Sequence, residues 1–455
     1  MISHSQQAQD DLDALRAELK KDDFDDAAIA TRLGRLKLAA RSSANLACVY
    51  CKDGISVLAE GVFGDTQDGR PLSSLEAARV LANAMLLKPE MQQVFADLNY
   101  MTRLVAWYSC QDNDHEFVGG RILFLLTYKS KVNFVSLVES QKLIDHVRAH
   151  LLRHSREVKH YADESKTMHS MALAESLKLL YNLTSKYPAQ MHFFSSTVNI
   201  LIGILNDVPI ATQPLDLPII QLLNALAIID WPTSLSKDHE KQTLSLSSRL
   251  IDLLNRSTNT VKPAELEAAL VSLLTTTRKV KELSYPKSDE FLRLSLLPQD
   301  EERDKPLGQS KTLASRLLKL QTSGGLTVLP DAISGLLFDL SDRDATKFVH
   351  NIGYGHAAGY LMTHKIPIPG NMKTATSSNG GANASPINPV TGQRLNAEVP
   401  VNMPEMTNAE KEREAERLFV LFERLKATGV IDVENPVMAA QQSGRFEELS
   451  DSEPD

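Results

Sequence analysis

Residues 171–188 read Met-Ala-Leu-Ala-Glu-Ser-Leu-Lys-Leu-Leu-Tyr-Asn-Leu-Thr-Ser-Lys-Tyr-Pro. Leu173, Leu177 and Leu180 recur at the three-to-four-residue spacing that places side chains on one face of an α-helix. Pro188 ends the pattern, because a proline cannot continue a helix. The stretch therefore predicts an amphipathic helix of about four turns that buries its apolar face.

The same helical periodicity runs through most of the chain, and no alternating strand pattern accompanies it. The periodic segments form groups that recur roughly every 40 to 55 residues, close to the unit length of armadillo and HEAT repeats. We therefore predict an all-α, armadillo/HEAT-like superhelical solenoid over residues 1–365, with a compact helical bundle as the alternative. Helices are predicted at residues 74–87, 171–185, 215–229, 263–278, 308–321, 328–341 and 343–350.

The charge balance and the apolar runs exclude several classes of protein. The 455-residue chain carries a formal net charge of −8 and is 43% hydrophobic. Nucleic-acid binding depends on an excess of Lys and Arg that displaces counterions from phosphates, so we expect no nucleic-acid partner. The N-terminus lacks a signal peptide's apolar stretch, and the longest apolar runs are too short to span a bilayer. We expect a cytoplasmic protein without a membrane span.

No catalytic or metal-binding motif emerges from the sequence. Cys48 and Cys51 have the spacing of zinc and redox sites, but no second ligand pair follows, and buried thiols are the alternative interpretation. His150 and His154 are four residues apart without an acidic or cysteine partner at metal-ligand spacing. Phosphate loops, nucleophile elbows and zinc-protease helices are missing. We therefore expect no cofactor, no metal and no covalent catalysis.

Asparagine follows an apolar run in three of the helical groups, at Asn83, Asn182 and Asn224. Asparagine is a mediocre helix former, because its amide competes for backbone hydrogen bonds. On the inner helix of each repeat, such amides can form paired hydrogen bonds with the main chain of a bound peptide. The alternative is that the amides are satisfied within the solenoid.

A glycine-rich segment, Gly353-Tyr-Gly-His-Ala-Ala-Gly359, follows the last predicted helix. It has one residue too many for a dinucleotide-binding fingerprint, and it follows a helical pattern rather than a strand. Glycines also allow two backbones to approach closely. We therefore predict a close backbone contact at the last helical repeat.

The composition changes again after the glycine-rich segment. Residues 366–406 are rich in Pro, Gly, Ser, Asn and Thr, which predicts a flexible linker. Thr407 and Glu410 then match a capping box, which predicts an amphipathic helix at residues 407–429. This helix should dock on a partner or on the solenoid itself, because it is marginal alone. Its partner-binding stripe would consist of Leu418, Phe419, Phe422 and Leu425.

Residues 430–455 form an acidic tail. Ser450 lies three residues before Glu453, and Ser452 lies three residues before Asp455, as in substrates of acid-directed kinases. Phosphates at these two serines would add negative charge and tune an electrostatic encounter. A tail that only increases solubility is the alternative.

The chain resembles the synembryn family (resistance to inhibitors of cholinesterase), the cytosolic exchange factors and folding chaperones of heterotrimeric G-protein alpha subunits. The resemblance spans most of the chain and is most specific in the last hundred residues. It rests on Gly353-Tyr-Gly-His-Ala-Ala-Gly359, Ile387-Asn-Pro-Val-Thr-Gly392 and Met406-Thr-Asn-Ala-Glu-Lys-Glu-Arg-Glu414.

This resemblance implies a superhelix whose concave face binds the C-terminal helix of an alpha subunit that is GDP-bound or nucleotide-free. It also implies that the helix after the linker contacts the nucleotide-binding domain, so that GDP leaves and the empty state is stabilised. The protein would act as a monomer and reach the cell cortex or plasma membrane through its partner. The candidate groove residues are Asn83, Arg121, Asn182 and Asn224, with Lys37 and Arg41 as cationic candidates. An armadillo-type peptide-binding adaptor or scaffold is the alternative function.

Overall fold

The computed structural model describes most of the helical part of the chain. The described residues are 4–21, 24–39, 46–64, 71–161, 167–232, 239–260, 263–367, 386–388 and 390–398, with Thr407, Arg413, Glu416, Arg417, Phe419 and Val420. They are predominantly helical, and β pairing among them is limited to an isolated antiparallel bridge between Ile387 and Arg394. The prediction of an all-α chain is confirmed.

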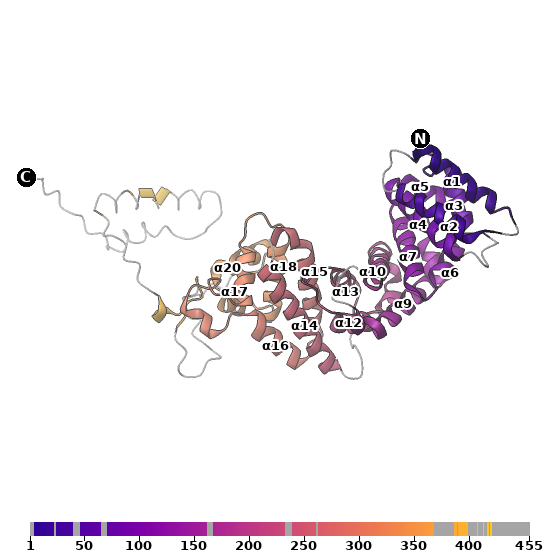
Figure 1. Ribbon diagram of the computed structural model, residues 1–455. Helices are drawn as coiled ribbons and strands as arrows, with labels where there is room; N and C mark the ends of the chain where they lie inside the picture. Colours follow the sequence, from indigo (N-terminus) through magenta and orange to yellow (C-terminus); the bar gives the residue numbers. More distant parts are fainter. Residues whose placement is uncertain are drawn as a thin grey trace, which may run out of the picture. The chain divides into compact units, whose positions relative to one another are not determined.

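The chain divides into two compact units, Met1–Ala397 and Glu398–Asp455. Figure 1 shows the helices of the first unit in chain order. Its N-terminal half contains α1 (His4–Glu18), α2 (Asp26–Ala39), α3 (Lys52–Phe63), α4 (Pro71–Leu87), α5 (Glu90–Ala96), α6 (Met101–Tyr108), α7 (Asn113–Lys129), α8 (Phe134–Glu139), α9 (Leu143–Glu157) and α10 (Met168–Lys186).

The C-terminal half of this unit continues with helices of five to 22 residues. They are α11 (Met191–Ser195), α12 (Val198–Asp207), α13 (Ile219–Ile228), α14 (His239–Thr260), α15 (Pro263–Glu282), α16 (Pro286–Leu296), the 3-10 helix η4 (Asp300–Asp304), α17 (Leu313–Gln321), α18 (Leu329–Leu340), α19 (Ala345–Ile352) and α20 (Tyr354–Thr363).

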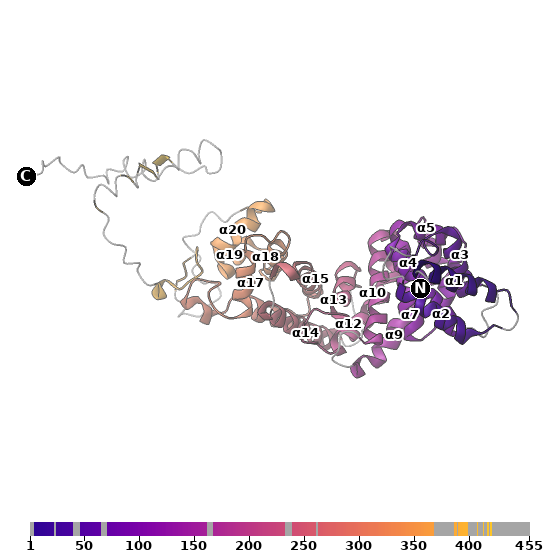
Figure 2. The ribbon, with the colours of Figure 1, turned by 45° about the horizontal axis from the view of Figure 1, so that its top comes forward.

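The longer helices form two rows. The first row is α4, α7, α10, α13, α15 and α18, each in contact with the next, and Figures 1 and 2 show the same order. The second row is α9, α12, α14 and α16, which also contact one another in succession. Neighbours pair across the rows, as α9 does with α10 and α12 with α13. Each pair of helices packs against its nearest neighbours, which defines a helical solenoid, as the sequence predicts.

The seven helices predicted from periodicity are all present. The largest shift is at α17, which begins at Leu313 rather than at residue 308. The reason is local, because the hydroxyl of Thr312 accepts a hydrogen bond from the backbone N–H of Ser315 at 3.2 Å and caps the helix. Leu173, Leu177 and Leu180 of α10 are fully buried, as their spacing predicts.

The predicted linker at residues 366–406 contains an ordered part. Residues 386–388 and 390–397 belong to the first compact unit, and the backbone N–H of Gly355 donates to the carbonyl of Val390 at 3.1 Å. Composition does not reveal this contact, because main-chain groups make it.

The second unit is described at a few positions. Arg413, Glu416, Arg417, Phe419 and Val420 are helical, within the range predicted for the amphipathic helix. Phe419 is half-buried. The remaining candidates of the C-terminal region lie outside the described residues, so their roles stay predictions: Leu418, Phe422, Leu425, Ser450 and Ser452.

Candidate functional site

Aromatic and cationic side chains alternate along one face of α7. Phe117, Arg121, Phe124 and Tyr128 are separated by four, three and four residues, so they share that face. The guanidinium carbon of Arg121 lies 4.4 Å from the centroid of the Phe117 ring. The rings of Phe124 and Tyr128 meet edge to face with centroids 5.2 Å apart. Tyr128 is nonetheless 54% exposed, so this face offers ring surface to a partner.

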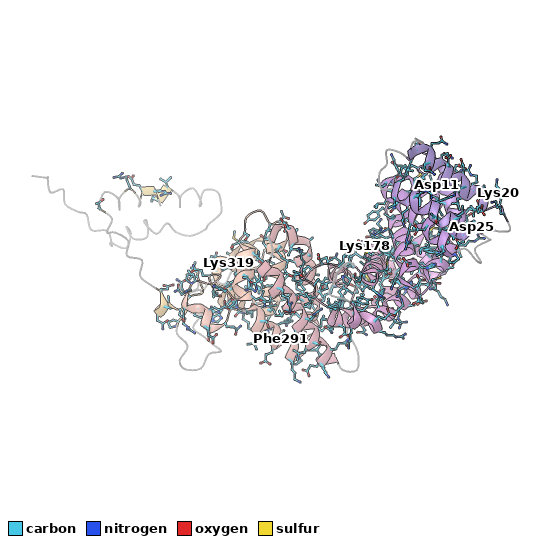
Figure 3. The ribbon with its side chains drawn as sticks, in the orientation of Figure 1. Asp11, Lys20, Asp25, Lys178, Phe291 and Lys319 are labelled. Atoms are coloured by element: carbon cyan, nitrogen blue, oxygen red, sulfur yellow. The ribbon has the colours of Figure 1, made fainter. Side chains whose placement is uncertain are left out.

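Helix α10 extends this surface beside α7. The ammonium nitrogen of Lys178 lies 6.0 Å from the centroid of Phe124, and that of Lys186 lies 5.2 Å from the centroid of Tyr128. Tyr181 is one turn from Lys178 and is 38% exposed. Figure 3 labels Lys178 where α10 follows the N-terminal helices. We name the following residues the aromatic–cationic strip: Phe117, Arg121, Phe124, Tyr128, Lys178, Tyr181 and Lys186.

The strip carries a local positive charge in an acidic protein. Buried Glu175 accepts hydrogen bonds from Arg121 at 2.8 Å and from Lys178 at 3.0 Å. The ammonium of Lys186 donates to the backbone carbonyl of Thr127. Glu175 therefore contacts two of the three cations of the strip and offsets one positive charge. Each cation over a ring contributes about 0.5–1 kcal/mol at such exposure. Rings and positive charge together suit an amphipathic helix that carries acidic groups.

The three predicted asparagines all lie on first-row helices, but their amides differ in surroundings. Asn182 is buried, and its Nδ2 donates to the hydroxyl of Thr127 on α7 at 2.8 Å. Oδ1 of half-buried Asn224 accepts from the hydroxyl of Ser272 on α15 at 2.7 Å. Asn83 of α4 is half-buried, and no side-chain hydrogen bond links it to another described residue. Partner binding by these asparagines stays a prediction, with Asn83 the most available of the three.

The cationic candidates also take part in links between helices. Lys37 of α2 pairs with Glu76 of α4 at 2.6 Å. Arg79 of α4 pairs with Glu76 and with Asp114 of α7. Burial acts to raise the pKa of Glu76, but the hydrogen bonds from Lys37 and Arg79 bring it below its ordinary value. Arg41 lies outside the described residues.

A buried polar cluster joins α7, α9 and α10 beneath the strip. Glu116 of α7 is fully buried and accepts from Nε2 of His154 at 2.8 Å and from the hydroxyl of Ser176 at 2.6 Å. Arg153 also pairs with Glu116. The histidine and its acid are 38 residues apart, so sequence spacing could not reveal the pairing.

The carboxylate of this cluster is surrounded by protein donors. Burial acts to raise the pKa of Glu116, but the hydrogen bond and charge of His154 lower it. Burial lowers the pKa of His150, whose Nε2 donates to the backbone carbonyl of Tyr108 at 2.8 Å. The guanidinium of Arg153 adds a positive charge beside the carboxylate of Glu116. Among the described residues, no group of three or more His, Cys, Asp or Glu side chains is placed to hold a metal ion.

The two closely spaced cysteines have a structural role. The sulfur of Cys51 accepts from the backbone N–H of Gly54 at 3.4 Å and so caps α3. Its thiol donates to the carbonyl of Cys48 at 3.2 Å. Burial raises the pKa of the Cys48 thiol, which opposes formation of a reactive thiolate.

None of the helices in the described ranges is long and apolar enough to cross a bilayer.

These features define the class of protein as an all-α solenoid with partly exposed aromatic and cationic side chains on α7 and α10. Comparison with known families then gives its identity. The family model described as "Guanine nucleotide exchange factor synembryn" matches residues 32–445, so the chain belongs to the synembryn family. The resemblance found in the C-terminal motifs is thereby confirmed.

Individual relatives share between 26% and 30% sequence identity with the chain in the three cases that follow. The chain is 30% identical to a "Synembryn-like chaperone" of Schizosaccharomyces pombe over 204 residues, which cover 42% of this chain and 36% of that protein. It is 29% identical to "Chaperone Ric-8A" of Xenopus tropicalis over 198 residues, or 42% and 35% of the two chains. It is 26% identical to "Chaperone Ric-8A" of Macaca fascicularis over 427 residues, or 86% and 78%. The chain thus spans about a third of the first two relatives.

Substitution of the asparagines tests which amide stabilises the fold. We expect Asn182→Ala to lower the free energy of unfolding by about 1–3 kcal/mol, because it removes a buried hydrogen bond. Asn83→Ala should change it by less than about 0.5 kcal/mol. Urea unfolding followed by circular dichroism measures both, and equal losses would contradict the assigned difference.

The buried cluster makes the protein sensitive to acid. Protonation of His150 is favoured in the unfolded chain from its ordinary pKa of about 6.5 downward, and stability falls over that range. A further loss comes as pH falls from the ordinary pKa of Glu116, about 4.3, through its lowered folded value.

Glu116→Gln tests this assignment. The variant should lose about 3–5 kcal/mol at pH 7, because Arg153 is left without its buried partner. It should also lose the part of the acid dependence that lies below about pH 4.3. Chemical unfolding between about pH 2 and pH 8 measures both effects. A pH profile identical to that of the parent protein would rule out Glu116 as the titrating group.

Proposed function

We propose that this chain is a guanine-nucleotide exchange factor and folding chaperone for heterotrimeric G-protein alpha subunits. Membership of the synembryn family supports the proposal, as do the names of relatives that are called chaperones. The aromatic–cationic strip is the observation on this chain that carries it. Exposed tyrosines beside cations are typical of surfaces that bind another protein.

The strip offers complementary contacts to the C-terminal helix of an alpha subunit. An apolar stripe on that helix would cover the rings of Phe124, Tyr128 and Tyr181. Acidic side chains or the terminal carboxylate would lie near Lys178 and Lys186. Arg121 and Lys178 share Glu175 as their acidic partner, which leaves Lys186 as the cation of the strip without a carboxylate at Glu175.

The proposed mechanism is differential binding without a covalent step. The chain would bind most tightly the alpha-subunit conformer whose C-terminal helix has left its resting place, and this conformer holds GDP weakly. Coupling is reciprocal, so a thousandfold preference for the empty form corresponds to a thousandfold weaker hold on GDP. That preference amounts to about 4 kcal/mol. Binding of GTP would reverse the equilibrium and release the alpha subunit.

A peptide-binding adaptor is the second candidate. Asn83, Asn182 and Asn224 on successive first-row helices favour it, because repeated amides suit main-chain recognition. Such an adaptor would bind its target equally well in every nucleotide state. Nucleotide dependence therefore separates the two functions.

The first test compares alpha subunits in different nucleotide states. We expect the purified chain to capture nucleotide-free alpha subunit in preference to the GDP and GTP-analogue forms, and to accelerate GDP release. Deletion of residues 407–455 should weaken the acceleration, because one of two contacts is lost. An alpha subunit without its C-terminal helix is the control. No acceleration together with no complex would refute the proposal.

The second test addresses the strip. We expect the double variant Tyr128→Ala/Tyr181→Ala to bind nucleotide-free alpha subunit at least about tenfold more weakly, because exposed aromatic anchors contribute about 1–2 kcal/mol each. Leu294→Ala is the matched control, since Leu294 is a 59% exposed apolar residue of α16 in the second row. Calorimetric titration measures the affinities, and equal losses in both proteins would exclude the strip as the binding surface.

A further inference from the structure

The two motifs of the C-terminal region contact each other in the folded chain. The backbone N–H of Gly355 donates to the carbonyl of Val390 at 3.1 Å, and that of Leu307 donates to the carbonyl of Thr391 at 3.1 Å. The segment that contains Ile387–Gly392 therefore lies against the start of α20 and the chain after η4. We name the described residues 386–388 and 390–397 the clasp.

Glycine is required on both sides of this contact. Gly353 has φ +80°, and a Cβ there would lie 3.0 Å from the carbonyl oxygen of Val390. Gly392 has φ +69°, and a Cβ there would collide with the side chain of Leu307. Both conformations are costly for any other residue. The two glycine-containing motifs are thus complementary surfaces of one contact.

Arg303 of η4 fastens the clasp from inside. Its side chain is buried, and its guanidinium donates to the carbonyls of Gly392 at 3.0 Å, His350 at 3.2 Å and Asn351 at 3.3 Å. The last two carbonyls belong to α19, so one side chain ties the last repeat to the clasp. Hydrogen bonds from a charged donor are stronger than neutral ones.

Further bonds hold the clasp in shape. The amide of Gln393 donates to the carbonyls of Asp304 and Ala397, each at 3.0 Å. Arg394 donates its backbone N–H to the carbonyl of Arg303 at 2.8 Å and pairs with Asp304 at 2.8 Å. The side chain of Asn388 accepts from the N–H of Val390 at 2.8 Å, which stabilises the turn. The clasp is therefore attached along most of its length.

This attachment changes the length of the chain between the solenoid and the second unit. The linker predicted from composition comprises the 41 residues 366–406. Counted from the end of the clasp, only the nine residues 398–406 separate Ala397 from Thr407. Ten extended Cα steps reach at most about 36 Å, whereas 41 residues could reach roughly 145 Å.

We propose that the clasp is a fixed anchor that shortens the tether of the 407–429 segment and so raises its effective concentration at an alpha subunit held by the solenoid. Effective concentration falls roughly as the −3/2 power of tether length once the span is covered. Shortening the tether from about 40 residues to about nine therefore raises it roughly tenfold. This inference rests on the proposed function and adds a positioning role for Arg303, Gly353 and Gly392.

Insertion of a flexible segment at two places tests the anchor. A 20-residue Gly/Ser insert between Ser377 and Ser378 precedes the clasp, and the same insert between Asn402 and Met403 follows it. We expect the first insert to leave the apparent affinity for nucleotide-free alpha subunit unchanged. The second should weaken it about sixfold, because the short tether becomes about 29 residues long. Equal losses of about twofold would overturn the anchor.

A variant of the clasp supplies the control. Gly392→Val should release the clasp through its collision with Leu307, after which the first insert should become as costly as the second. In a chain that ends at residue 406, Gly392→Val should leave the affinity unchanged, because no tethered segment remains. An equal loss in the full and shortened chains would mean that the clasp only stabilises the last repeat.

Two readouts separate this inference from the proposed function. An unmodified chain that neither binds nor accelerates nucleotide release would sink the proposed function. Slow amide hydrogen exchange at Gly355 and Arg394, whose N–H groups donate across the contact to the carbonyls of Val390 and Arg303, reports on clasp attachment without any alpha subunit. Fast exchange at both positions would overturn the anchor even in an active protein.

Discussion

The buried carboxylate of Glu116 is the interaction on which the N-terminal half of the solenoid depends. Side chains of α9 and α10 donate hydrogen bonds to this residue of α7. The aromatic–cationic strip lies on two of these helices, α7 and α10. An ionised carboxylate in a protein interior is tolerated only when its partners are in place. The strip therefore lies on helices that are joined by a buried charge, and this charge is costly to leave unpaired.

The strip and the clasp solve different physical problems. On the strip, rings and cations stay partly exposed, which leaves apolar area and charge for a partner to cover. In the clasp, backbone carbonyls are satisfied by Arg303 and by neighbouring N–H groups, so little is left for a partner. The strip thus leaves side chains for a partner to cover, whereas the clasp uses its hydrogen-bonding groups within the chain. Together they suit a protein that holds one partner at two places.

Much of the fold could be predicted from local pattern, whereas the site residues could be predicted only in part. Leucine spacing in α10 fixed its buried face, because helical geometry alone decides which side chains share a face. Arg121 and Asn182 were predicted as groove residues, and in the structure both are engaged by neighbours, Arg121 with Glu175 and Asn182 with Thr127. Spacing within one helix carries no information about which side chains a neighbouring helix presents.

By itself, the sequence determined the all-α class, the repeated helical units and the family to which the C-terminal motifs belong. Each of these follows from periodicity or from short motifs, which are properties of neighbouring residues. Only the tertiary structure decided that Glu116 meets His154 across 38 residues, and that the Gly353 and Gly392 motifs form a single contact. The physical reason is that buried pairs and main-chain hydrogen bonds depend on the packing of distant segments, which composition and spacing do not encode.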